Sequence, residues 1–182
     1  MKRALFSVLV LAFALPRVGA AQSETPVQFA ERYFEAAHQA DWDSVAALMH
    51  PDALVSLKAM FAPLVAADTT GEMALGLFAL EGPAEFESAT PGDIFASLMR
   101  QMTAMSPELA QIMSSARAQV IGTVREEGTD VRHVVYRLVM ETQGIEVEKL
   151  QVISMRPWGD TWGAILTGEI KGLAAALAGR GG

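Results

Sequence analysis

The chain contains no cysteine. This absence excludes disulfide bonds, thiolate catalysis and metal sites ligated by cysteine. Motifs that would identify a reaction are missing as well, since no HExxH pair, GxSxG elbow or glycine-rich phosphate loop occurs. The sequence therefore does not define a specific function, and what it predicts concerns the fold and the position of a pocket.

Basic residues are scarce, because 14 lysines and arginines stand against 21 acidic residues and leave a net charge of −7. Such a chain repels phosphate backbones and anionic lipid headgroups, so we expect no nucleic-acid partner. Long apolar runs are scarce too. Only residues 4–15 form one, and no second run approaches the roughly 20 residues of a membrane-spanning helix. We therefore expect no stable membrane insertion.

The first 21 residues have the order of a secretory signal peptide. Lys2 and Arg3 precede the apolar run, and small residues follow at 18–21. The run would span about 18 Å as a helix, short of the roughly 30 Å hydrocarbon core, so a permanent anchor is the weaker interpretation. Cleavage after Ala20 or Ala21 would leave a mature domain over residues 22–182 with a charge near −10. We expect a periplasmic or secreted protein.

Residues 118–169 predict four consecutive β-strands joined by short turns. Gly and polar residues occupy the turns at 127–130, 142–145 and 157–160, a composition that reverses a strand within a few residues. Between the turns lie runs rich in Val, Ile, Leu and Tyr, such as residues 131–140. The second half of the chain is therefore expected to form a sheet, with the helices folded against it.

Helical signals dominate the first half. Thr25 and Pro26 open a predicted helix over 26–39, in which Phe29, Tyr33 and Phe34 share one apolar stripe. Asp41 is placed to cap a second, shorter helix, which Pro51 ends.

Residues 56–117 are predicted to be a helical elaboration of the same domain. Thr-Pro and Ser-Pro pairs open helices at about 91–104 and 107–116, and an earlier helix is predicted at about 71–81. Glu81-Gly82-Pro83 indicates a break, with an acidic connector over 85–88. A short helix over 170–178 is expected to close the chain.

Two segments carry a resemblance to a known family. The pattern of residues 25–57, in particular FAERYFEAAHQADWDSVAALMHPDALV, is similar to the opening of NTF2-like (SnoaL-like) domains. The segment RPWGDTWGAILTG near the end resembles their closing hairpin. The resemblance implies an α+β cone, in which a curved antiparallel sheet wraps around an N-terminal helical hairpin and further helices and leaves an apolar pocket.

Alternation along the strand over 131–141 separates two faces. Tyr136 lies on the more apolar face, which is predicted to point inward, and His133 and Arg137 lie on the other. We predict that Tyr33, Tyr136 and Trp162 line one apolar cavity as ligand-binding residues, with the helical segment 91–116 over its mouth. The alternative is that each is an ordinary core aromatic.

Candidates for catalysis and for metal binding have simpler interpretations. The acidic residues are assigned to a solvated hairpin rim or to helix caps: Glu141, Glu146, Glu148, Asp41 and Asp43. His38, Asp41 and His50 are interpreted as solvent-exposed helix ends, and no cofactor is expected. Three methionines spaced as MxxMxxM, Met99, Met102 and Met105, could offer thioether ligands to copper(I), but they also continue an apolar helix stripe.

These observations favour an exported, non-catalytic domain that binds a small apolar molecule, lipid or peptide. One alternative is an isomerase, dehydratase or hydrolase that uses the same pocket. A buried carboxylate or histidine within hydrogen-bond reach of Tyr33 or Tyr136 would favour it. The other alternative is a structural module that forms a homodimer through the sheet, and a solid core would favour that.

Overall fold

The computed structural model describes residues 24–142, 144–166 and 172. The predicted signal peptide lies outside these residues, as does the predicted terminal helix apart from residue 172. Helices come first in the described part and strands follow: α1 (Pro26–His38), α2 (Trp42–Ala47), α3 (Pro51–Ala67), α4 (Glu72–Phe78), α5 (Pro83–Ser88), α6 (Pro91–Met105), α7 (Pro107–Ser115), β1 (Arg117–Arg125), β2 (Arg132–Thr142), β3 (Ile145–Trp158) and β4 (Thr161–Ala164). The prediction of an α+β fold with a curved antiparallel sheet is confirmed.

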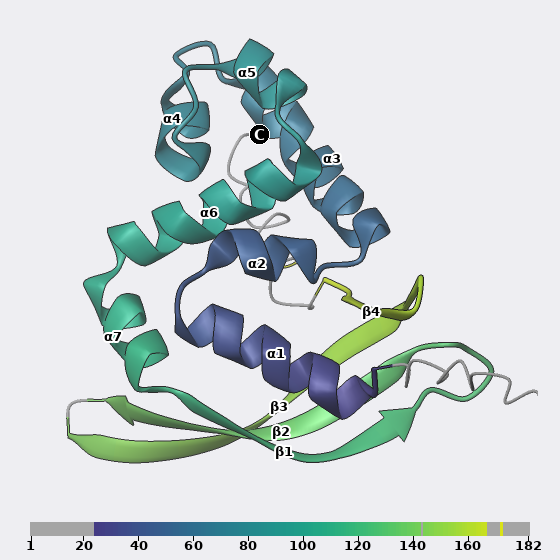
Figure 1. Ribbon diagram of the computed structural model, residues 1–182. Helices are drawn as coiled ribbons and strands as arrows, with labels where there is room; N and C mark the ends of the chain where they lie inside the picture. Colours follow the sequence, from purple (N-terminus) through teal and green to yellow (C-terminus); the bar gives the residue numbers. More distant parts are fainter. Residues whose placement is uncertain (1–23, 143, 167–171, 173–182) are drawn as a thin grey trace, which may run out of the picture.

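The sheet has the order β1-β2-β3-β4, and each strand is antiparallel to its neighbour. Gly128, Gly144 and Gly159 adopt positive φ angles of 76°, 76° and 57° in the three hairpins, a conformation that suits glycine because it has no Cβ. A bulge between Val120 and Gly122 shifts the register of β1 against β2. Because a bulge bends its strand and increases the local twist, it contributes to the curvature seen in Figure 1.

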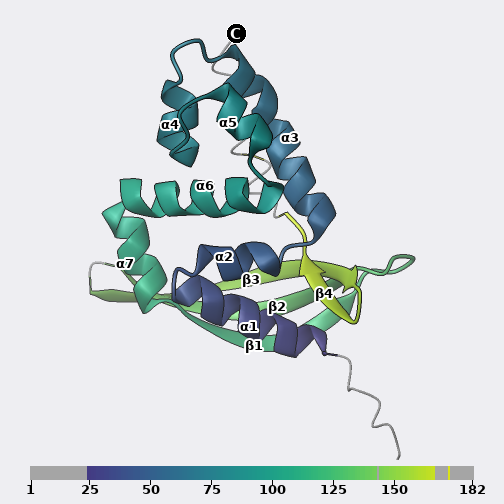
Figure 2. The ribbon, with the colours of Figure 1, turned by 45° about the horizontal axis from the view of Figure 1, so that its top comes forward.

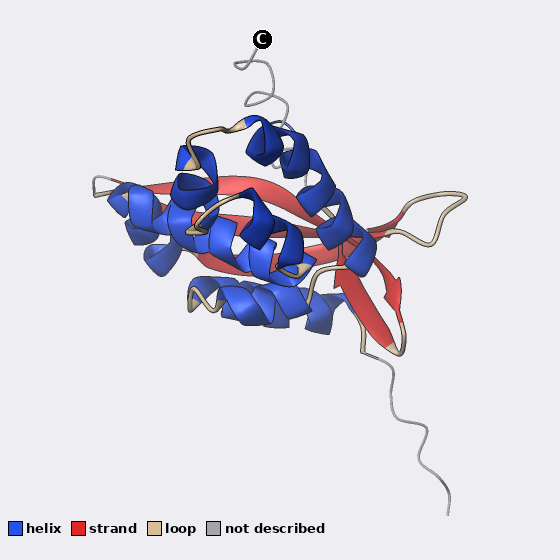
Figure 3. Ribbon diagram, turned by 90° about the horizontal axis from the view of Figure 1, so that it is seen from above, coloured by secondary structure: helices blue, strands red, loops and turns tan. Residues whose placement is uncertain are grey.

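The helices lie on one face of this sheet in successive layers (Figures 1 and 2). Helix α1 contacts β1, β2 and β4, and α2 lies beside it. Helix α6 contacts α2, α3 and α4, and so separates the α1 layer from the outer helices α3 to α5. Seen from above, the helices lie over the sheet (Figure 3), and the side views show no helix of the described part on its opposite face (Figures 1 and 2).

Helix α1 begins at a capping box. The backbone N–H of Gln28 donates to the Thr25 hydroxyl at 3.3 Å, and the Gln28 side chain accepts from the Thr25 backbone N–H at 3.0 Å. Phe29 and Ala30 are fully buried against the sheet, whereas Tyr33 and Phe34 are half-buried further along the helix. The predicted helix and its inward stripe are thus confirmed, and the stripe is buried most deeply at its start.

His50 is buried, which corrects its interpretation as a solvent-exposed helix end. The residue is 8% exposed, and its Nδ1 accepts from the backbone N–H of Asp52 at 3.2 Å. His50 is therefore the N-cap of α3, in which Pro51 occupies the first position. The prediction that Pro51 ends the second helix is wrong, because α2 already ends at Ala47 with its C-cap at Leu48. Pro51 instead begins a 17-residue helix that the sequence pattern did not reveal.

The acidic connector predicted over residues 85–88 is wrong, because these residues belong to α5. Phe86 anchors this short helix in a core of edge-on aromatic rings with Phe61 and Phe78, whose centroids lie 5.1–5.3 Å apart. The Lys58 ammonium caps the other end by donating to the carbonyls of Glu87 and Ala89 at 2.7 and 2.6 Å. Tertiary contacts therefore stabilise a helix that its local sequence does not specify.

The end of β4 joins the sheet to the helical layers. The backbone N–H of His50 donates to the Ala164 carbonyl at 2.7 Å, and the N–H of Ala164 donates to the Leu48 carbonyl at 2.9 Å. At this approach a Cβ on Gly163 would lie 2.8 Å from the Cα of His50, which leaves room only for glycine.

Candidate functional site

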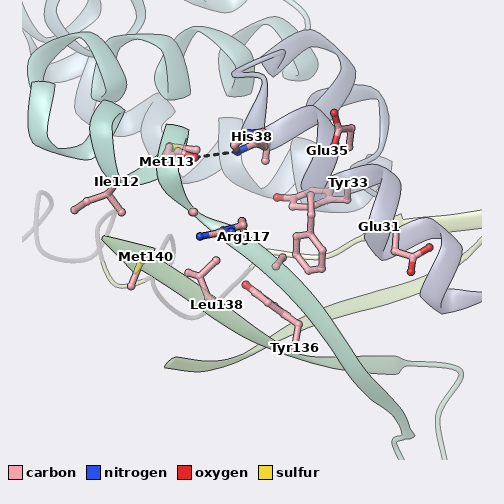
Figure 4. Close-up of a pocket in the computed structure, with 14 residues that line it drawn as sticks. Glu31, Tyr33, Glu35, His38, Ile112, Met113, Arg117, Tyr136, Leu138 and Met140 are labelled. Carbon is pink, nitrogen blue, oxygen red and sulfur yellow. Dashed lines mark hydrogen bonds between the residues drawn. The ribbon is translucent and has the colours of Figure 1, made fainter. Parts of the chain in front are cut away.

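A groove of about 660 Å³ opens between α1, α7 and the strands β1 and β2 (Figure 4). Its walls are mainly apolar and aromatic, and six side chains define them: Tyr33, Phe34, Met113, Tyr136, Leu138 and Met140. They come from three elements that lie far apart in the sequence. The groove therefore exists only in the folded chain.

Strand periodicity places the floor of the groove. Tyr136, Leu138 and Met140 alternate along β2 and point toward α1. The opposite face of β2 carries His133, whose Nδ1 lies 2.9 Å from the Ser154 hydroxyl, and Arg137, whose Nε lies 3.6 Å from Glu148. The predicted assignment of the two faces is thus confirmed.

Helix α1 supplies one wall. The Phe34 ring packs on the Tyr136 ring with 4.3 Å between centroids, and the Tyr33 ring meets Phe34 edge-on at 6.0 Å. Burial raises the pKa of Tyr33 to about 12, and the nearby Tyr136 adds a smaller effect in the same direction. The Tyr33 hydroxyl therefore stays protonated at neutral pH and remains a hydrogen-bond donor.

The Tyr33 hydroxyl has no hydrogen-bond partner among the described residues. Every fully buried polar side-chain atom in that part of the chain has a partner, so this hydroxyl reaches the open space of the groove. Figure 4 shows it directed toward Met113 and Arg117. It is one of the few polar groups that a bound molecule would meet there.

Helix α7 forms the second wall through Ile112 and Met113. His38, at the end of α1, holds this wall in place, because its Nδ1 lies 3.3 Å from the Met113 carbonyl (Figure 4). The prediction that residues 91–116 cover the mouth is only half right. Helix α7 borders the groove, whereas α6 buries Ile94, Phe95 and Leu98 against other helices.

The prediction that Trp162 shares the cavity with the two tyrosines is wrong. Trp162 lies on β4 near the start of α1, where its indole N–H donates to the Glu24 carbonyl at 2.9 Å. The Arg132 guanidinium lies 5.8 Å from its ring. The groove lies near the C-terminal end of α1. The tight turn at Gly159 instead brings Trp162 to the N-terminal end of this helix, so its side chain does not line the groove.

A second, more polar hollow of about 390 Å³ adjoins the groove. The two share His38, Arg117 and Met140, and the polar hollow continues to Ser114, Ser115, Glu141 and Glu146. Arg117 makes no ion pair with any residue that the structure describes. The apolar groove and the polar hollow therefore adjoin, and Arg117, which has no ion-pair partner in the described part of the chain, lines both.

Other polar candidates serve structural roles. The Asp41 carboxylate caps α2 by accepting from the Ser44 hydroxyl and N–H, and these hydrogen bonds lower its pKa. Met99 and Met102 pack against the core, while Met105 is 68% exposed. Residues 24–142 and 144–166 contain no cluster of three His, Asp or Glu side chains placed to hold a metal ion.

Within the described ranges, no helix is both long enough and apolar enough to cross a membrane. Comparison with known proteins gave no match: no family model, no curated protein and no solved structure is similar to this chain. The site therefore has to be interpreted from its own geometry.

Proposed function

We propose that this chain is an exported, non-catalytic protein that binds a small apolar molecule in the groove between α1, α7 and the sheet. The observation that carries the proposal is the groove itself. Its volume of about 660 Å³ falls within the roughly 300–1,000 Å³ of small-molecule sites, and aromatic, aliphatic and thioether side chains form its walls. Met113 and Met140 add flexible surfaces that adapt to irregular ligands.

The titratable groups support binding without chemistry. General acid and base catalysis needs a carboxylate or imidazole whose pKa is tuned by apolar surroundings. Glu31, Glu35 and His38 border the groove but are exposed, and Figure 4 shows both carboxylates on the outer side of α1. The one buried charged or polar residue in the described part is His50, which does not line the groove.

The proposal includes the NTF2-like family as the origin of the fold. A pair of helices followed by a curved antiparallel sheet, with the pocket between them, is the arrangement that the resemblance implies. Export rests on the leader-like order of residues 1–21. N-terminal sequencing of the exported protein should then begin at Ala21 or Gln22, and a full-length chain would contradict export.

The outer face of the sheet supports a homodimer as a second part of the proposal. Val124, Leu150 and Val152 lie there at 55%, 66% and 47% exposure, although large apolar side chains usually gather in buried clusters. A second copy packed on this face would cover them and would leave the groove on the other face open. Sedimentation equilibrium of the wild type and a Leu150→Lys variant tests this part independently of ligand binding.

A groove-filling substitution tests the binding function. Ala118 lines the groove on β1, and Gln119, its neighbour, lies on the opposite face of the same strand. Titration with the neutral fluorescent probe N-phenyl-1-naphthylamine should show saturable binding to the wild type and to Gln119→Phe. Ala118→Phe should weaken that binding at least about tenfold, because a phenyl ring would occupy the space of the ligand. Equal binding by both variants would refute the groove as the site.

A further inference from the structure

The groove and the polar hollow together offer an apolar end and a polar end, an arrangement that suits an amphiphilic ligand. One end of the combined space is bounded by Phe34, Tyr136 and Leu138, and the other by Ser114 and two carboxylates. An entirely apolar ligand would leave the hydrogen-bonding groups of the polar hollow without a contact. A molecule with an apolar body and one polar head would satisfy both halves.

The groups at the junction determine the sign of that head. Arg117 lines both spaces, and its guanidinium makes no ion pair with the described residues. The Tyr33 hydroxyl faces the same groove and has no hydrogen-bond partner among residues 24–142 and 144–166, and Figure 4 shows Arg117 between Tyr33 and Leu138. A guanidinium alone offers two parallel N–H donors that suit the two oxygens of a carboxylate.

The acidic residues of the hollow limit where an anion can sit. Glu141 and Glu146 lie directly opposite each other on β2 and β3, and they line the polar hollow but not the groove. A carboxylate attached directly to an apolar body meets Arg117 at the junction before it approaches these two side chains. A cationic head would instead be repelled by Arg117 at the same point.

We infer that the ligand is a single-chain amphiphile whose tail lies along Phe34, Tyr136 and Leu138 and whose carboxylate is held by Arg117, where the groove adjoins the polar hollow. This inference rests on the proposed binding function and adds the chemical class of the ligand. It gives Arg117, which has no ion-pair partner among the described residues, a counter-charge beside the apolar groove of an otherwise acidic protein.

Three ligands of equal chain length test the head group: dodecanoate, 1-dodecanol and dodecylammonium. Each would displace N-phenyl-1-naphthylamine from the full-length mature protein at pH 8, below its micellar concentration. Dodecanoate should bind about tenfold more tightly than dodecanol, the size expected of a hydrogen bond to a charged group, and dodecylammonium should bind most weakly. Arg117→Gln should abolish the advantage of the acid over the alcohol.

Arg125→Gln, at the other end of β1, is the matched control and should preserve that advantage. The double variant Glu141→Gln, Glu146→Gln should strengthen dodecanoate binding, because it removes two like charges from the hollow. Equal binding of acid and alcohol to the wild type, or an advantage that survives Arg117→Gln, would overturn the head-group assignment. If the neutral probe still binds in that case, the proposed function stands; if neither the probe nor any chain binds, both fail.

Discussion

The rings of Phe34 and Tyr136 pack with their centroids 4.3 Å apart and join α1 to β2 at the floor of the groove. Phe29 lies five residues earlier on the same helix and is fully buried, whereas Phe34 is only half-buried because one side of its ring faces the groove. The same apolar stripe therefore has one end in the core and one end at the groove.

Alanine substitutions should separate these two roles. Phe29→Ala should lower the free energy of unfolding by about 3–5 kcal/mol, the range for a fully buried aromatic side chain. Phe34→Ala should cost less stability, about 1–2 kcal/mol, but should weaken probe binding more than its stability loss explains. Denaturant melts and probe titrations of both variants measure this, with Glu87→Ala, an exposed position on α5 away from the groove, as control. Equal stability losses at both positions would contradict the difference in burial.

Glycine at position 163 should be essential for the contact between β4 and the start of α3. Gly163→Ala would place its Cβ 2.8 Å from the Cα and 3.0 Å from the backbone nitrogen of His50, and backbone atoms cannot move aside as a flexible side chain could. We expect a loss of about 1–3 kcal/mol in the free energy of unfolding, as for overpacking elsewhere. Gly122→Ala is the control, because its Cβ would meet no atom within 4 Å. A fully stable Gly163→Ala protein would contradict the close approach.

The raised pKa of Tyr33 predicts a specific dependence of stability on pH. In the unfolded chain Tyr33 ionises near pH 10, whereas in the folded protein its pKa is about 12. The folded state therefore keeps a proton that the unfolded state has lost, and stability should fall as the pH rises from about 10 to 12. Tyr33→Phe should reduce this fall. An absorbance titration of the native protein, which has only two tyrosines, should show one ionising late.

Much of the fold could be predicted because local signals coincide with tertiary ones. Gly128, Gly144 and Gly159 identified the hairpins, since each adopts a positive φ, and Thr25 identified the first helix through its cap. Helix α3 was missed for a physical reason. Pro51 was interpreted only as a stop, although proline fits the first position of a helix equally well when the residue before it supplies a cap.

The site was predictable only where strand and helix periodicity determine it. Tyr33 and Tyr136 follow from the faces of α1 and β2, and Leu138 and Met140 share the face of Tyr136. The position of Trp162 depends on how the four-residue strand β4 packs against the start of α1, and no local sequence pattern encodes this contact. Met113 and Arg117 reach the groove through the packing of α7 against α1, which is a tertiary contact.

Methyl NMR of the methionine side chains can show whether a ligand binds in the groove between α1, α7 and the sheet. Met113 and Met140 line the groove, whereas Met105 is 68% exposed and does not, so the protein carries its own probes and its own control. Titration of the mature protein with N-phenyl-1-naphthylamine, whose rings shift nearby resonances strongly, should move the methyl signals of Met113 and Met140 together and saturably while that of Met105 stays in place. Unchanged Met113 and Met140 signals at saturating probe, or shifts confined to Met105, would contradict binding in the groove.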